Sequence, residues 1–257
     1  MLKRIVFIAM LALAAVRADA LEYTDVYYNP AESGWGISFT QRGNNVFVAW
    51  YTYDASGNPK WYVASNCAIT GTACGGLLYE VNGPHFFGTA FNPAQSVVTQ
   101  PGSIQLSFAD TSHASMSYTL NGQARTVAIT RQLAQAPAAG SMIDYTDLWW
   151  NPAESGWGAA ITQYGNQMFL AWYVYDAAGK PVWYVASNCA FNAAGTGCSG
   201  TLYRTTGPAF GPSFNPASVQ VFEAGTATLD FTDGNNGRLS YTVNGITSSK
   251  AITRQLF

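Results

Sequence analysis

The feature that most constrains this chain is an eight-residue motif that occurs twice, reading NPAESGWG at residues 29–36 and again at 151–158. Each copy opens a unit of about 110 residues, which is an ordinary size for one domain. Asn-Pro disfavours helix and marks a turn. The glycines beside Trp35 favour a positive φ or a close backbone approach. The motif is therefore predicted to be a turn that leads Trp35 into a strand.

The repetition extends over nearly the whole chain, since residues 61–67 read WYVASNC and residues 183–189 read the same. A repeat of this length predicts two tandem units of one fold. Between them lies a stretch rich in small residues with a proline, as is typical of a linker. The predicted boundaries are residues 21–133 for the first unit, 134–143 for the linker and 144–257 for the second unit.

The first twenty residues resemble a secretory signal. Lys3 and Arg4 form a basic start, residues 5–16 are apolar, and residues 18–20 read Ala-Asp-Ala, a small-x-small cleavage site. The apolar run is too short for a transmembrane helix, so no membrane span is predicted. We expect a secreted or periplasmic protein, cleaved near Ala20.

Charge argues against nucleic acid as a partner. Only 10% of the residues are charged, against about 25% in typical domains. Removing Lys3, Arg4, Arg17 and Asp19 with the signal leaves nine basic and thirteen acidic residues, a net charge of −4. Binding to phosphates depends on clustered Lys and Arg, and the chain contains no basic run.

The four cysteines form two local pairs, Cys67 with Cys74 and Cys189 with Cys198. Four cysteines allow three connectivities, and the duplication favours one disulfide in each unit. In an exported protein such pairs are typical disulfides. A zinc site is the alternative, but the spacing lacks the usual CxxC pattern, and we predict no metal and no cofactor.

The hydrophobic pattern of each unit is that of β structure. Short alternating segments are separated by turn residues, and Asn121-Gly122 is a strong hairpin signal. We predict an all-β protein of two tandem antiparallel meanders, each a small barrel of about eight strands or a barrel-like sandwich. The strands expected in the first unit are residues 37–41, 46–53, 59–66, 77–81, 96–100, 104–108, 114–120 and 124–131.

The strand expected at residues 46–53 is apolar on both faces, because Trp50 points one way while Tyr51 and Tyr53 point the other. Such a strand is usually buried on both sides. One face is expected to fill the barrel, and the other to pack on the sister unit or to form an aromatic platform. Platforms of this kind suit sugars or small apolar and aromatic molecules. The candidate ligand contacts are Trp50, Tyr53, Trp61, Asn66, Trp172, Tyr175, Trp183 and Asn188.

Glu32, Trp35 and Arg131 are expected to be structural. Arg131 ends the last strand of its unit, and its guanidinium could stack on Trp35 and pair with Glu32 at one barrel end. The second unit offers the same set. Its members are Glu154, Trp157 and Arg254.

An enzyme is the less favoured hypothesis. His85 and His113 have no counterparts in the second unit, which excludes a histidine-based triad common to both units. The chain has no nucleophile elbow, phosphate loop or zinc-protease motif. Glu32 or Glu154 beside a second carboxylate could hydrolyse a glycosidic bond, so a hydrolase remains an alternative.

Two resemblances follow from these motifs. The unit resembles a repeat of secreted bacterial proteins of unsettled function, in which NPxESGWG precedes WYxYDxxGxPxWY, here residues 50–62 and 172–184. In fold it resembles the calycins (lipocalins and avidins), eight-stranded meander barrels with a tryptophan in the first strand and an arginine in the last. Trp35 with Arg131 and Trp157 with Arg254 match that pair, although the chain has Gly-Trp-Gly where lipocalins have Gly-x-Trp.

The sequence therefore predicts an exported, non-enzymatic module that binds a glycan or a small apolar or aromatic ligand through aromatic surfaces. The alternative is a structural or protein-interaction component of the cell envelope or extracellular matrix. A carboxylate-based hydrolase ranks third.

Overall fold

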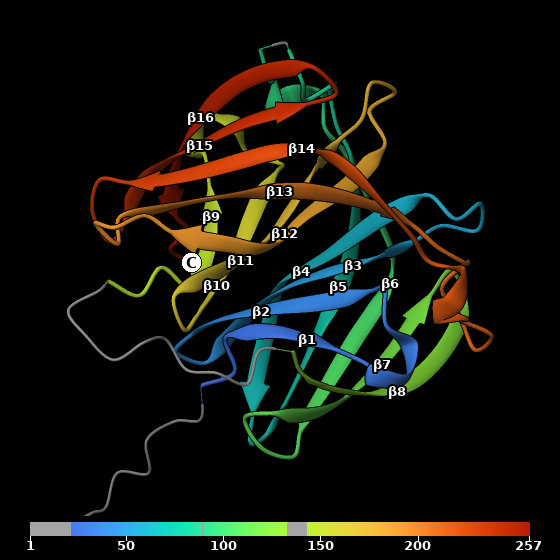
Figure 1. The fold of residues 1–257 in the computed structure, drawn as a ribbon. Coiled ribbons are helices and arrows are strands. Elements are labelled where there is room, and N and C mark those ends of the chain that lie inside the picture. The colour runs from blue at the N-terminus through green and yellow to red at the C-terminus, as the bar shows by residue number, and fades with distance from the viewer. Residues whose placement is uncertain (1–21, 89, 133–142) are drawn as a thin grey trace, which may run out of the picture.

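The computed structural model describes residues 22–88, 90–132 and 143–257. These residues form two closed antiparallel barrels of eight strands, in tandem sequence order, as the sequence predicts (Figure 1). The signal expected at residues 1–20 lies outside the described residues, as does all but the last residue of the expected linker. In the described part of the chain, no helix is long and apolar enough to cross a membrane.

Each barrel is a meander in which every strand pairs with the next and the last pairs with the first. Barrel 1 consists of β1 (Asp25–Tyr28), β2 (Gly36–Arg42), β3 (Asn45–Tyr53), β4 (Pro59–Thr70), β5 (Ala73–Asn82), β6 (Val97–Phe108), β7 (His113–Leu120) and β8 (Gln123–Arg131). Barrel 2 consists of β9 (Asp147–Trp150), β10 (Gly158–Tyr164), β11 (Gln167–Tyr175), β12 (Pro181–Phe191), β13 (Gly197–Thr206), β14 (Gln220–Phe231), β15 (Asn236–Val243) and β16 (Ile246–Arg254). Single 3-10 turns are η1 (Pro30–Glu32), η2 (Pro93–Gln95), η3 (Pro152–Glu154) and η4 (Pro216–Ser218).

The repeated motif is a turn, as predicted. The Asn29 side chain accepts a hydrogen bond from the Ala31 N–H at 3.0 Å and so caps η1. Gly34 has φ +124°, a conformation that side chains rarely adopt. The carbonyl of Gly34 accepts a hydrogen bond from the Tyr53 hydroxyl, which ties the turn to the end of β3.

Two strand predictions are wrong, although they leave the count at eight. The short β1 escaped prediction, because four residues are too few to show alternation. Residues 96–100 and 104–108 belong almost entirely to one strand, β6, in which Pro101-Gly102 mark an irregularity of register and not a turn. A Cβ on Gly102 would lie 1.7 Å from the carbonyl oxygen of Thr119 on β7, so only glycine fits there.

One disulfide joins neighbouring strands in each barrel. Cys67–Cys74 connects β4 to β5, and Cys189–Cys198 connects β12 to β13. This is the pairing that the duplication favours, with one disulfide inside each unit.

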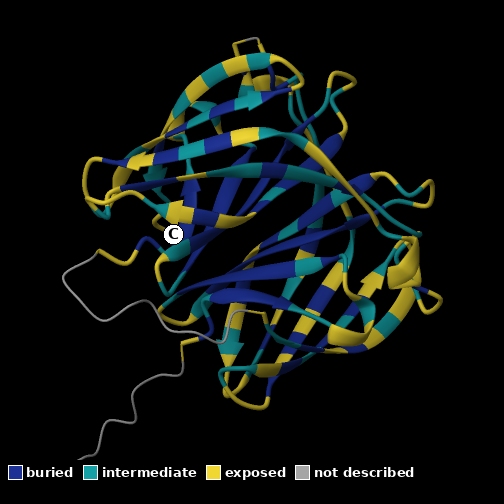
Figure 2. Ribbon diagram, in the orientation of Figure 1, coloured by how far each residue is buried: buried dark blue, intermediate teal, exposed yellow. Residues whose placement is uncertain are grey.

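The barrels pack against each other through β4 and β12, and the neighbouring strands β3 and β11 are buried on both faces (Figure 2). The contacts are reciprocal. The Trp61 indole N–H donates to the carbonyl of Val174, and the Trp183 indole N–H donates to the carbonyl of Thr52, both at 3.0 Å. The two units are thus related by an approximate twofold axis.

Each barrel also sends a segment across the seam. We call residues 83–88, after β5, arm 1, and residues 207–212, after β13, arm 2. The arms reach the strands of the opposite barrel (Figure 1). The Gly83 N–H donates to the carbonyl of Gly179 at 3.1 Å, and the Gly207 N–H donates to the carbonyl of Gly57 at 3.2 Å. These bonds anchor each arm on a turn of the sister barrel.

Candidate functional site

The structure distributes the predicted ligand contacts over three places. Trp50 and Trp172 are fully buried inside the barrels. Tyr53, Trp61 and their counterparts Tyr175 and Trp183 are buried at the seam. Asn66 and Asn188 are exposed on the outer surface. No single site brings these eight residues together, and the packing alternative describes the seam better than an open platform does.

The arms fill the barrel interiors with phenylalanine. Phe86 of arm 1 lies inside barrel 2, with its ring centroid 5.1 Å from that of Trp157 and 5.4 Å from that of Trp172. Phe210 of arm 2 lies inside barrel 1, 4.8 Å from Trp35 and 5.0 Å from Trp50. These two indoles of each barrel therefore contact a ring supplied by the other unit.

In each barrel, an ion pair lies beside the phenylalanine ring that the other unit supplies. In barrel 1, Arg125 on β8 pairs with Glu32, lies 5.6 Å from the ring centroid of Phe210, and donates a hydrogen bond of 2.9 Å to the carbonyl of Gly211. Barrel 2 reproduces this arrangement with a lysine that comes two residues later in its strand. Lys250 pairs with Glu154 at 2.7 Å and lies 5.3 Å from the centroid of Phe86.

The partners expected for Arg131 are therefore wrong. Its guanidinium pairs with Asp25, with Nε 3.3 Å from the carboxylate, and lies 5.8 Å from the ring centroid of Tyr27. The barrel closes with Arg131 opposite Tyr27. The cation that reaches Glu32 is Arg125, six residues and about 20 Å earlier along β8.

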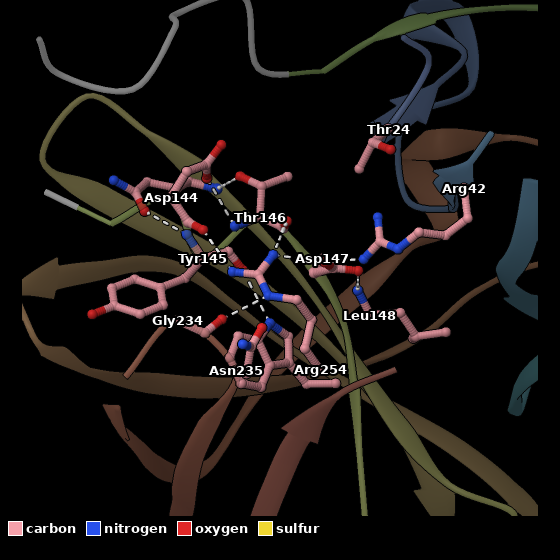
Figure 3. A network of polar contacts seen from close by, with 12 residues as sticks. Thr24, Arg42, Asp144, Tyr145, Thr146, Asp147, Leu148, Gly234, Asn235 and Arg254 are labelled. Atoms are coloured by element: carbon pink, nitrogen blue, oxygen red, sulfur yellow. Dashed lines mark hydrogen bonds and ion pairs between the residues drawn. The ribbon is translucent and has the colours of Figure 1, made fainter. Parts of the chain in front are cut away.

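Arg254 likewise lies over Trp149 on β9, 5.1 Å from the centroid, and not over Trp157 as expected. Trp157 instead donates its indole N–H to Glu154 at 3.2 Å. The Arg254 guanidinium contacts Asp147 at 2.6 Å (Figure 3). Asp147 also accepts from Arg42, which comes from β2 of barrel 1, so this carboxylate links the two barrels.

The corresponding carboxylate of barrel 1, Asp25, has a different electrostatic environment. Burial raises the pKa of Asp25 to about 6, although the Val26 N–H and the Arg131 guanidinium act to lower it. Tyr164 replaces Arg42 at the corresponding position of β10. Asp25 therefore lacks the second guanidinium that Asp147 has.

This pKa predicts a pH dependence of stability. Between about pH 4 and 6 the folded protein holds the Asp25 proton that the unfolded chain has released, so the free energy of unfolding should fall as pH rises. The expected change is about 2 kcal/mol. Urea titrations of the protein and of Asp25→Asn at several pH values in this range test the prediction. The unfolding free energy of the variant should fall less steeply with pH than that of the original protein. Equal slopes would contradict the prediction.

A pocket of about 490 Å³ opens at the end of barrel 1 where arm 2 enters, and we call it the mouth pocket. Lys60, Tyr62, Tyr118 and Arg125 line it from the barrel, and Phe210 and Gly211 line it from the arm. Trp50 packs behind it, against both tyrosines. Tyr53 is the one predicted ligand contact among the lining residues.

Barrel 2 shows what fits such a pocket, because arm 1 carries a second phenylalanine. Phe87 follows Phe86, whereas Gly211 follows Phe210. The Phe87 ring meets three aromatic rings of barrel 2 edge to face, at centroid distances of 5.7 Å to Trp172, 5.8 Å to Tyr184 and 5.7 Å to Tyr241. The counterparts of these three rings in barrel 1 are Trp50, Tyr62 and Tyr118.

The two sets of three rings, which we call aromatic cages, have nearly the same geometry. Trp50 and Tyr62 are 5.5 Å apart at 42°, and Trp172 and Tyr184 are 5.7 Å apart at 41°. The other pairs, Trp50 with Tyr118 and Trp172 with Tyr241, are both 4.9 Å apart, at 51° and 46°. The cage of barrel 1 thus has the shape of one that holds a phenyl ring, and arm 2 supplies no second ring to it.

Sequence reasoning does not find this site, because arm 1 lies between the strands expected at residues 77–81 and 96–100 and shows no pattern of its own. The signal lies in the comparison of the copies, Gly-Pro-His-Phe-Phe against Gly-Pro-Ala-Phe-Gly. Nothing in that difference shows that each arm enters the opposite barrel, so the pocket becomes visible only in three dimensions.

Comparison with protein-family models, curated proteins and solved structures found no match for this chain. The function must therefore be argued from the site. Within residues 22–88, 90–132 and 143–257, no three His, Cys, Asp or Glu side chains gather as a metal site. Glu32 and Glu154 are each neutralised by a cation, which weighs against their use as acid or base in hydrolysis.

Proposed function

We propose that the protein is an exported, non-enzymatic binding module that takes a small aromatic ligand in the mouth pocket of barrel 1. The observation that carries this proposal is Phe87, which occupies the matching cage of barrel 2. Export is supported by the signal-like residues 1–20 and by one disulfide in each barrel.

The cage favours an aromatic ring for a physical reason. Edge-to-face contacts place the positive edge of one ring against the negative face of another, and each is worth about 0.5–1.5 kcal/mol beyond the area buried. Tyr62 and Tyr118, which line the pocket, offer such contacts. A volume of about 490 Å³ falls in the range of small-molecule sites.

The experiment is a titration with 4-fluorobenzyl alcohol, followed by the fluorine NMR signal. We expect one site per chain. Gly211→Phe should reduce the affinity at least tenfold, because the new ring takes the place that Phe87 has in barrel 2. A Cβ on Gly211 meets no atom within 4 Å, so the substitution should not disturb the arm. Phe87→Gly should open a second site and raise the stoichiometry to two.

Gly211→Ala is the matched control, since it adds a methyl group but no ring and should retain binding. Cyclohexylmethanol and a set of oligosaccharides are tested in the same assay, to compare binding of an aliphatic ring and of sugars with binding of the aromatic ring. Binding by Gly211→Phe equal to that of the original protein would place the ligand elsewhere. Absence of binding by the original protein and by Phe87→Gly would exclude an aromatic ligand in either cage.

A structural or interaction role is the second candidate, favoured by apolar residues left exposed at matching places on the two barrels. Val98 on β6 and Val221 on β14 are 59% and 62% exposed, and Phe222 beside Val221 is 47% exposed. Contiguous exposed apolar residues commonly mark contact surfaces. Self-association that Val98→Ser with Val221→Ser abolishes, in sedimentation experiments, would support this role over the first.

A further inference from the structure

A second cavity lies between the barrels and is independent of the mouth pocket. It has a volume of about 380 Å³, and matching residues of both units line it, including Asp54 with Asp176 and Pro59 with Pro181. This symmetry places it on the approximate twofold axis, and we call it the axial cleft. Asp54 and Lys60 line both the axial cleft and the mouth pocket.

The acidic groups of the axial cleft are already bonded. The Asp54 carboxylate accepts hydrogen bonds from the backbone N–H groups of Ser56 at 2.8 Å and Asn58 at 2.9 Å. Asp176 caps its own turn in the same way. Glu80 pairs with Lys60 at 2.8 Å. These carboxylates therefore have partners that compete with any cation entering the cleft.

Arg204, a basic group that barrel 2 contributes to the cleft, has no such partner among the described residues. Arg204 stands at the position that corresponds to Glu80, and Val182 at the position that corresponds to Lys60. The ion pair of barrel 1 has thus been replaced in barrel 2 by a guanidinium beside an apolar side chain. Among the described residues Arg204 makes no ion pair, and its Nε is shielded from solvent without a hydrogen-bond acceptor.

An N–H donor that is buried without an acceptor raises the free energy of the folded state, by about 1–3 kcal/mol or more when the group is charged. A guanidinium binds best to a planar group with two oxygens, because its N–H donors form a rigid fork. Lys180 adds a second positive charge, and Tyr184 a hydroxyl group, to the same cleft. Arg204 itself lines the cleft, so a ligand that suits this guanidinium is anionic and small enough for the cleft.

We propose that the axial cleft binds a small carboxylate, which pairs with Arg204. The proposal does not rest on aromatic binding in the mouth pocket. The probe is succinate, and succinamide is its uncharged isostere. Titration should show one saturable succinate site, a shift of the Arg204 Nε–H signal in nitrogen-resolved NMR spectra, and no binding of succinamide. Added salt should weaken the binding, because the attraction is electrostatic.

Arg204→Gln should reduce succinate affinity at least tenfold. Arg238→Gln removes the same charge from an exposed site on β15 and should leave the affinity unchanged. The double variant Val182→Lys with Arg204→Glu recreates the ion pair of barrel 1, so it should fold and fail to bind. Gly211→Phe should bind succinate normally, which separates this site from the mouth pocket.

Two outcomes would overturn the proposal. One is equal binding of succinate and succinamide, which would show that charge is not recognised. The other is unchanged succinate affinity in both Arg204→Gln and the double variant, which would place the anion elsewhere on the surface.

Discussion

Replacing Phe86 by alanine is expected to lower the free energy of unfolding by about 3–5 kcal/mol, the usual loss for a buried phenylalanine. Phe86 is fully buried and contacts Trp157, Trp172 and Tyr241 of the other unit. Its removal leaves a cavity inside barrel 2, and also removes an anchor that holds arm 1 there. The loss should therefore weaken the coupling between the barrels as well as the barrel core.

Calorimetry and urea titration test both effects. The original protein should unfold in one transition, whereas Phe86→Ala should unfold earlier, with a calorimetric enthalpy larger than the van't Hoff enthalpy. Phe222→Ala is the control, because that ring is 47% exposed, and its effect should stay within about 0.5 kcal/mol. A loss of stability no larger for Phe86→Ala than for Phe222→Ala would mean that arm 1 does not occupy barrel 2 in solution.

Replacing Glu32 by alanine is expected to cost about 2–4 kcal/mol, because it leaves the Arg125 guanidinium without its carboxylate. Both side chains are about 85% buried, with 14% and 15% of their surfaces exposed. Arg125 also holds arm 2, through its hydrogen bond to the carbonyl of Gly211 and its position over Phe210. Loss of the ion pair should therefore also loosen the entrance of the mouth pocket.

A double-mutant cycle identifies the partner of Glu32. Glu32→Ala with Arg125→Ala should show a coupling energy of about 1.5 kcal/mol or more, whereas Glu32→Ala with Arg131→Ala should be additive within about 0.5 kcal/mol. The measurement is the urea midpoint of each single and double variant. Coupling to Arg131 and not to Arg125 would contradict the closure of barrel 1 seen in the structure.

Much of the fold could be predicted because the signals are local. Alternation of apolar residues, the Asn-Gly hairpins and the duplicated cysteines all act over a few residues, and they indicated antiparallel barrels with one disulfide each. The failures also have local causes. The strand β1 is only four residues long, and Pro101-Gly102 has the sequence of a turn but lies within a strand.

The partners of the charged residues were harder to predict, because they depend on register. Arg125 and Arg131 lie on the same strand and are chemically identical. Which of them reaches Glu32 is set by how β8 pairs with β1 when the barrel closes. Sequence reasoning favours Arg131, because it ends the last strand and both copies have an arginine there, whereas the residue that corresponds to Arg125 in the second unit is Ser248.

The sequence by itself determined that this chain is two copies of one antiparallel β unit, because hydrophobic period and turn chemistry act between near neighbours. Only the tertiary structure decided that each unit inserts an aromatic arm into the other, that barrel 1 receives one ring where barrel 2 receives two, and that Arg204 faces a cleft without an acceptor. These features depend on contacts between residues about 70 or more positions apart, such as Phe86 with Trp157. Such contacts form only once both barrels have closed and packed, so no local pattern encodes them.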